Sequence, residues 1–182
     1  MAVIFVTGAA YATLWPLLLI YVQNRFTSSV GLVAVAYLPA ALVASFLSPV
    51  LGRLSDRVGR APVMALGLAG SGLLALLIPA LPNLRWLAVL WALEAGGLAM
   101  AVPAETALVA DLTGGEQRGA GYGLYTVAAS LGALCGPVLG GWLYDTQSRA
   151  LPFYGCSGLL LAGAVAVTLL LRSLKGTERS AI

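Results

Sequence analysis

The chain has 182 residues, of which 60% are hydrophobic and 9% are charged, and its formal net charge is +3. Its mean hydropathy of +0.94 excludes an ordinary soluble domain. With no histidine and two cysteines, the sequence predicts no metal or cofactor site, and no nucleophile–base pair or nucleotide-binding loop suggests an enzyme.

Six apolar segments follow one another along the chain, and each is long enough to cross a bilayer as a helix. A bilayer core about 30 Å thick requires roughly 20 apolar residues in a helix. The segments cover residues 2–22, 30–51, 62–81, 86–110, 120–143 and 152–171. They leave only short connections, so the sequence predicts an all-α membrane protein with six transmembrane helices in a single domain, residues 1–182. The first segment has no basic leader and no A-x-A cleavage site, so we expect it to be retained.

The first segment carries a polar and aromatic stripe. Thr7, Tyr11 and Trp15 are spaced by four residues, so they lie near one another on one side of a helix. Such a stripe is more often used for packing than for binding.

A charged stretch, GRLSDRVGRAP at 52–62, joins the second and third segments. We expect it to form a tight turn in which Gly52 and Gly59 permit close approach and unusual backbone angles. Asp56 can accept hydrogen bonds from a helix N-terminus, and Arg57 and Arg60 can pair with carboxylates. The alternative is a basic turn with no further role.

Two acids, Glu94 and Glu105, lie inside the fourth segment. Eleven residues correspond to about three turns plus 20°, so both acids lie on one face of the helix. An ionised carboxylate near the centre of a membrane helix costs roughly 2.5–3.5 kcal/mol on insertion scales. Each acid is therefore either a proton-coupling or substrate-contacting group, or a hydrogen-bonded carboxyl that locks helices together. Glu105 is nearer the end of the segment.

A charged turn and a small-residue face follow the fourth segment. We expect Asp111, Glu116 and Arg118 to form the turn. The fifth segment then places small residues and a proline on one face, which favours close helix packing and a bend. These residues are Gly132, Gly136, Pro137, Gly140 and Gly141.

The basic residues are distributed unevenly between the two sides of the predicted bundle. Seven lie in the connections after segments two and four or beyond segment six: Arg53, Arg57, Arg60, Arg118, Arg172, Lys175 and Arg179. Only Arg25, Arg85 and Arg149 lie on the other side. This positive-inside bias predicts that both termini face the cytoplasm, and it explains the net charge without a nucleic-acid partner.

An internal repeat appears when the chain is shifted against itself by 88 residues. The run Pro-Val-Leu-Gly at 49–52 then matches the same four residues at 137–140, and Tyr37 matches Tyr125. Because 88 residues here contain three segments, the two copies would be inverted in the membrane. We therefore expect two inverted three-helix repeats, at about 1–85 and 86–175.

The motif Gly52-x-x-x-Asp56-Arg57-x-Gly59-Arg60 resembles the loop that joins the second and third helices in the major facilitator superfamily of secondary transporters. That family often continues the motif with another basic residue, whereas this chain has Ala61. The stretch 110–141 resembles the family's passage from the fourth helix into the fifth. The resemblance implies a six-helix half of a transporter that moves a small solute by alternating access, driven by a gradient.

In the resembled fold, the first and fourth helices line the central cavity. This implies that Thr7, Tyr11, Trp15 and Glu94, with Tyr125 as a weaker candidate, contact the substrate, and that Glu94 and Glu105 are candidates for proton coupling. The resemblance also implies a cavity face that would meet lipid in an isolated half, and a partner that is a second six-helix half or a second copy.

The choice of half stays open at the level of sequence. The fourth segment lacks the arginine that is usual in N-terminal halves of drug–proton antiporters, and the chain ends in a short basic tail, which favours the C-terminal half. The alternatives are the N-terminal half of a drug–proton antiporter and a non-transporting membrane scaffold or assembly factor.

Overall fold

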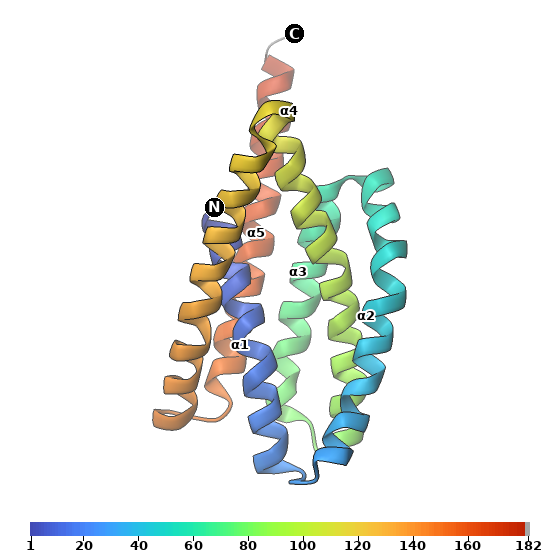
Figure 1. The fold of residues 1–182 in the computed structure, drawn as a ribbon, viewed down its shortest axis with the longest axis vertical. Helices are drawn as coiled ribbons and strands as arrows, with labels where there is room; N and C mark the ends of the chain where they lie inside the picture. Colours follow the sequence, from blue (N-terminus) through green and yellow to red (C-terminus); the bar gives the residue numbers. More distant parts are fainter. Residues whose placement is uncertain (181–182) are drawn as a thin grey trace.

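The computed structural model shows a bundle of long helices (Figure 1). It describes the backbone of residues 1–180, and the side chains of these residues except 112, 114–118 and 171–180. Within that range no strand is present, and both the N-terminus and the end of the last helix lie toward the same end of the bundle. The elements are α1 (Ala2–Arg25), α2 (Val30–Val58), α3 (Arg60–Leu77), the 3₁₀ turn η1 (Ile78–Ala80), α4 (Leu84–Thr146) and α5 (Leu151–Ser180).

Six helical stretches are long and apolar enough to cross a membrane, which confirms the expected all-α, six-span architecture. Two of them belong to α4, which rises as a first arm, Leu84–Asp111, and returns as a second arm, Gly119–Thr146. Figure 1 shows this reversal at the upper end of the bundle. The expected charged turn thus lies within a continuous helix, α4. Its members Glu116 and Arg118 are not among the residues whose side chains are described.

The loop predicted at 52–62 is mostly helical, which corrects that expectation. Helix α2 continues seven residues beyond the predicted end at 51 and reaches Val58. The helix breaks only at Gly59, whose φ of 111° lies in the region that glycine tolerates best. Arg60 then begins α3. The segment can extend as a helix because residues 51–58 contain neither proline nor an interior glycine pair to stop it.

The helices pair in a reciprocal pattern. Helix α1 packs against the second arm of α4, where a side-chain carbon added at Gly8 would lie 2.8 Å from the Ala129 carbonyl oxygen. Helix α2 packs against the first arm, where a carbon at Gly96 would lie 3.8 Å from Val43 and Leu47. Helix α3 contacts the first arm and α5, and α1 also contacts α5. The main contacts are thus one–five with two–four, one–six with three–four, and three–six. Each contact has its counterpart when spans one, two and three are exchanged with spans four, five and six, respectively.

The small-residue face of the second arm lies against α1. A carbon added at Gly132 or Gly136 would overlap backbone atoms of α1, and one at Gly140 would overlap Thr13. Gly141, by contrast, faces open space. The two helices therefore approach closely enough that only hydrogen fits at three of the four glycines.

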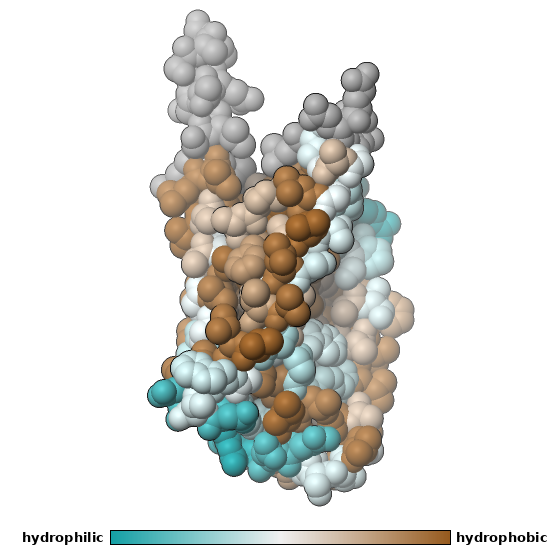
Figure 2. Space-filling model, turned by 60° about the vertical axis from the view of Figure 1, so that its left-hand side comes forward, coloured by the Kyte–Doolittle hydropathy of each residue, from teal (hydrophilic) through white to brown (hydrophobic). Residues whose placement is uncertain are grey.

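The bundle buries its interior helices and leaves two spans largely uncovered. In α2 and in the second arm of α4, only 17% of the most apolar 18-residue stretch is buried, compared with 39–50% in the other spans. Exposed apolar side chains on these two spans include Leu42, Phe46, Leu134, Val138 and Trp142. Figure 2 shows apolar surface over the middle of one face and hydrophilic residues gathered at its lower end. This distribution is that of a bundle surrounded by lipid or by another apolar bundle.

Candidate functional site

Two carboxyl groups lie in the interior of the bundle, on the first arm of α4. Glu94 is 2% exposed and Glu105 is 5% exposed. Among the described side chains, neither acid pairs with a basic residue, because the ion pairs there all involve Arg60. A buried carboxyl without a counterion must hold a proton, meet hydrogen-bond donors, or face a cavity in another state of the protein.

The burial of these groups corrects one expectation. Thr7 and Glu94 were expected on a cavity face that would meet lipid in an isolated half, but Thr7 is 1% exposed and Glu94 is 2% exposed. The backbones of α3 and of the first arm of α4 pack closely together next to Glu94. A carbon at Gly67 would lie 2.6 Å from the Gly97 carbonyl oxygen, and the Ser71 hydroxyl donates to the Glu94 carbonyl oxygen at 3.4 Å.

Thr7 and Glu105 meet across the interface between α1 and α4. The Thr7 hydroxyl oxygen lies 3.3 Å from one carboxyl oxygen of Glu105 and 3.5 Å from the other. It also lies 3.1 Å from the Ile4 carbonyl oxygen, one turn earlier on α1. The structure thus brings together one residue of the predicted stripe and one of the two predicted acids.

Tyr11 lies one helical turn after Thr7 on α1, in the same region as the two acids. Glu94, Glu105 and Tyr125 are all within electrostatic range of its hydroxyl group. That hydroxyl is buried and has no hydrogen-bond partner among the described residues. Five predicted site residues from α1 and from both arms of α4 therefore lie in one region of the bundle: Thr7, Tyr11, Glu94, Glu105 and Tyr125.

Trp15 lies outside this group and belongs to an aromatic cluster. Its ring centroid lies 5.4 Å from that of Trp91 and 6.0 Å from that of Tyr37. Sequence reasoning did not select Trp91 or Tyr37. A signal for each was present, since Trp91 precedes Glu94 by three residues on the same helix and Tyr37 is the repeat counterpart of Tyr125.

A second polar cluster closes the end of the bundle where α2 meets α3. The Arg60 guanidinium lies 2.6 Å from a carboxyl oxygen of Asp111, and it also donates to the Ala107 carbonyl oxygen. Its contact with Asp56 is longer, at 3.6 Å. Asp56 therefore pairs with an arginine rather than with a helix N-terminus, and Arg57 is exposed on α2. Gly52 lies on the same helix, next to Pro103 of the first arm.

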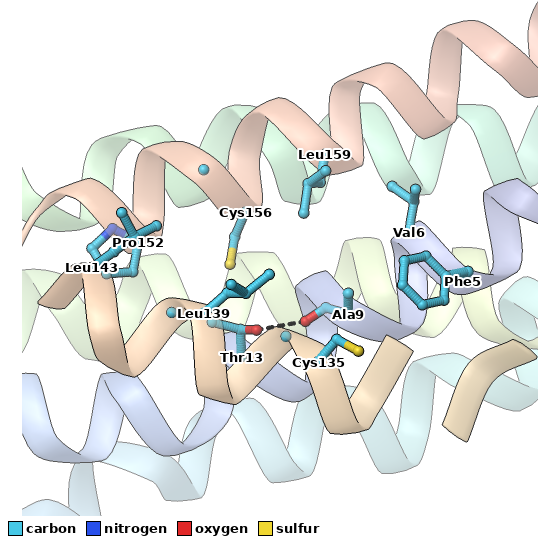
Figure 3. Close-up of a pocket in the computed structure, with 13 residues that line it drawn as sticks. Phe5, Val6, Ala9, Thr13, Cys135, Leu139, Leu143, Pro152, Cys156 and Leu159 are labelled. Atoms are coloured by element: carbon cyan, nitrogen blue, oxygen red, sulfur yellow. Dashed lines mark hydrogen bonds between the residues drawn. The ribbon is translucent and has the colours of Figure 1, made fainter. Parts of the chain in front are cut away.

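An apolar crevice of about 370 Å³ lies between α1, the second arm of α4 and α5 (Figure 3). In Figure 3 the Cys156 side chain points toward Leu139, and the Thr13 hydroxyl donates to the Ala9 carbonyl oxygen at 2.6 Å. The crevice contains neither Glu94 nor Glu105. We therefore place the candidate site at the acids and not in this crevice.

Comparisons with known proteins identify the family of the chain. Residues 1–181 match the Major Facilitator Superfamily. The tetracycline resistance protein, class C, of Escherichia coli is 34% identical over 142 residues, which are 75% of this chain and 33% of that protein. The multi-drug resistance efflux pump PmrA of Streptococcus pneumoniae is 34% identical over 149 residues, covering 78% of this chain and 36% of the pump.

A third relative is the multidrug resistance protein MdtG of Proteus mirabilis, which is 33% identical over 160 residues, or 86% of this chain and 40% of that protein. The chain thus spans about a third of the length of the relatives it matches. The matched family is one of transporters, as the sequence motifs implied. With its six apolar helices and this match over nearly its whole length, the chain is a multi-pass membrane protein that belongs to the major facilitator superfamily.

Proposed function

We propose that this chain forms half of a gradient-driven efflux transporter, which moves a small solute across the membrane by alternating access. The observation that carries the proposal is the buried Thr7–Glu105 contact, at which Glu105 forms no salt bridge with a described side chain. Membership of a transporter family and the efflux proteins among the relatives support the direction of transport. Thr7, Tyr11, Glu94 and Tyr125 would contact the solute or a coupled proton.

The hydrogen bonds of Thr7 support proton coupling at Glu105. A hydroxyl group has one proton to donate and can accept bonds through its lone pairs. A protonated Glu105 can donate to Thr7 while the Thr7 hydroxyl donates to the Ile4 carbonyl oxygen at 3.1 Å. After Glu105 releases its proton, the Thr7 hydroxyl can turn and donate to the carboxylate instead. One hydroxyl group compensates little of the charge of a buried carboxylate, so proton release favours a conformational change that exposes Glu105 to water.

The partner of this bundle would be a second six-helix half or a second copy. Two spans, α2 and the second arm of α4, leave apolar side chains uncovered, and the relatives are about three times as long as the matched region. The lack of an arginine within residues 86–110 of span four favours the role of a C-terminal half. The N-terminal half of a drug–proton antiporter is the alternative.

The two three-helix repeats, about 1–85 and 86–175, would provide the symmetry of the bundle. Gly8 and Gly96 are 88 residues apart, and each lies at a close helix contact: Gly8 between spans one and five, and Gly96 between spans four and two. Such reciprocal contacts are those that an inverted repeat produces. We further propose an inner-membrane location with both termini in the cytoplasm, on the basis of the basic residues.

Glu105→Gln is the test of the coupling role. Glutamine can donate to Thr7 as a protonated acid does, but it cannot release a proton. We expect the complete transporter with this substitution to retain solute exchange across vesicle membranes and to lose accumulation driven by a proton gradient. Glu94→Gln is compared in parallel. Asp145→Asn, at an exposed position on the second arm, is the matched control and should accumulate solute normally.

Unchanged accumulation in both glutamine variants would remove the acids from the coupling mechanism. Loss of exchange together with accumulation in Glu105→Gln would assign Glu105 a packing role only.

A further inference from the structure

Three aromatic rings from three different helices meet in a single cluster. Trp15 comes from α1, Tyr37 from α2 and Trp91 from the first arm of α4. The ring centroids are separated by 5.4 Å for Trp15 and Trp91, by 5.9 Å for Tyr37 and Trp91, and by 6.0 Å for Trp15 and Tyr37. The ring planes are inclined by 53–74°, as aromatic pairs prefer. Direct contact between α1 and α2 is sparse, so these rings bridge the gap between them.

Two polar atoms of this cluster lack a hydrogen-bond partner among the described residues. They are the Trp91 indole nitrogen and the Tyr37 hydroxyl oxygen, and both are buried. Trp91 is only 2% exposed. An indole N–H can only donate, so an acceptor must be supplied from outside the cluster. Native structures rarely leave buried donors unpaired without a reason such as an absent ligand.

A hollow of about 560 Å³ lies between α1 and α2, beside the rings of Trp15 and Tyr37, and Trp91 lies behind these two rings. Trp15 and Tyr37 form part of its wall, and Leu19 and Val33 form another part. Trp15 is 46% exposed, so it is the least confined of the three rings. The volume is within the range of pockets that hold drug-sized molecules, which is about 300–1,000 Å³.

We propose that the Trp15–Tyr37–Trp91 cluster binds a neutral, planar aromatic solute that carries carbonyl-type hydrogen-bond acceptors. The solute enters the hollow between α1 and α2 and stacks on the rings. As Trp15 turns aside, an acceptor on the solute accepts a hydrogen bond from the Trp91 indole N–H, and a second acceptor accepts one from the Tyr37 hydroxyl. This rests on the proposed transport function, for which it names the class of solute.

The competing occupant is an organic cation. Aromatic faces attract cations, and Glu94 follows Trp91 by three residues on the same arm. The unpaired atoms favour the neutral solute, because a cation brings no acceptor for the Trp91 N–H and is repelled by the positive end of that bond. The two classes make opposite predictions for the removal of the polar atoms alone.

A pair of probes tests the proposal with the protein purified from membranes and held in lipid nanodiscs. Coumarin is neutral and planar and carries a lactone, whereas naphthalene has two fused rings and no acceptor. Saturable binding above that of empty nanodiscs is measured by equilibrium dialysis. We expect coumarin to bind more tightly than naphthalene, and Trp91→Phe and Tyr37→Phe each to weaken coumarin about two- to tenfold, the effect of one neutral hydrogen bond. Naphthalene binding should stay unchanged in Tyr37→Phe. In Trp91→Phe, which also removes a fused ring, naphthalene should be weakened less than coumarin.

Matched controls lie on the same chain. Trp86→Phe alters an exposed indole on the same arm as Trp91, and Tyr154→Phe alters an exposed phenol on α5. Both should bind coumarin as the unmodified protein does. Melting temperatures in nanodiscs confirm that each variant is folded, and Tyr37→Phe, at a less buried position, serves as a second variant if Trp91→Phe does not fold.

Equal binding of the two probes, or coumarin binding that neither phenylalanine variant weakens, overturns the proposal. So does saturable binding of tetraphenylphosphonium that both phenylalanine variants retain and Trp15→Ala abolishes, because that result assigns the rings to a cation. Since binding is measured without a gradient, a transporter that binds coumarin and fails to accumulate any solute contradicts the proposed function and leaves this site intact.

Discussion

At the scale of single residues, Arg60 is the contact that joins the loop motif to the rest of the bundle. Its guanidinium reaches Asp111 at 2.6 Å and Asp56 at 3.6 Å. Asp111 lies at the end of the first arm, the helix that also carries Glu94 and Glu105. The closer partner of Arg60 is therefore on the helix with the buried acids. A movement of that arm would change the distance between Asp111 and Arg60.

We expect Asp111→Asn to slow transport more than Asp56→Asn does. The Asp111 side chain is 57% exposed, and exposed ion pairs contribute about 0.2–1 kcal/mol, so the effect on the rate should be at most about fivefold. Initial transport rates at matched expression levels measure the difference. A larger loss in Asp56→Asn would place the functional contact of the motif at Asp56 and outside this bundle.

At the scale of the helices, hydropathy located the spans well but not their ends. Helix α2 continues to Val58 because a helix whose sequence contains no breaker can extend beyond an apolar stretch, and hydropathy does not detect that extension. The position of Gly59, the residue with φ of 111°, is what sets the break. The sequence predicts a turn between the two arms of α4, whereas the backbone stays helical there. Composition does not specify that backbone geometry.

The candidate site was predicted in part, and helix geometry explains the rest. Residues four apart on a helix drift by about 40°, so Trp15 lies about 80° around α1 from Thr7. Thr7 therefore faces Glu105, and Trp15 faces Tyr37 and Trp91. A prediction from one helix at a time cannot bring in residues from two others.

The contact between α1 and the second arm predicts a sharp contrast between two neighbouring glycines. A carbon added at Gly136 overlaps the Ala9 carbonyl oxygen, whereas one at Gly141 meets nothing within 4 Å. We expect Gly136→Ala to destabilise the bundle by about 1–3 kcal/mol, the cost of overpacking, and Gly141→Ala to leave stability unchanged. Denaturant unfolding of the protein in mixed micelles gives both values. Equal stability of the two variants would mean that the helices are farther apart than in this structure.

At the scale of the whole molecule, the described bundle is closed around its acids. Glu94 and Glu105 are 2% and 5% exposed, and Thr7 is 1% exposed, so these three side chains are covered by other described residues of the bundle. The two spans whose most apolar stretches are least buried are α2 and the second arm of α4. These observations support a transport pathway that forms between this bundle and another one, as the bundle opens toward its partner.

We therefore expect residues 1–182 to insert into a membrane and not to transport as a monomer. Burial of Glu94 removes the cost of exposing that carboxyl to lipid, so insertion needs no partner, but one bundle supplies only one wall of a pathway. The purified chain is reconstituted at about one copy per vesicle, and solute flux is compared with vesicles that also contain the partner half, or several copies of the chain. Flux should rise with the partner and stay at the level of empty vesicles without it. Flux from single copies would show that the six helices form a pathway by themselves and would contradict the requirement for a second bundle.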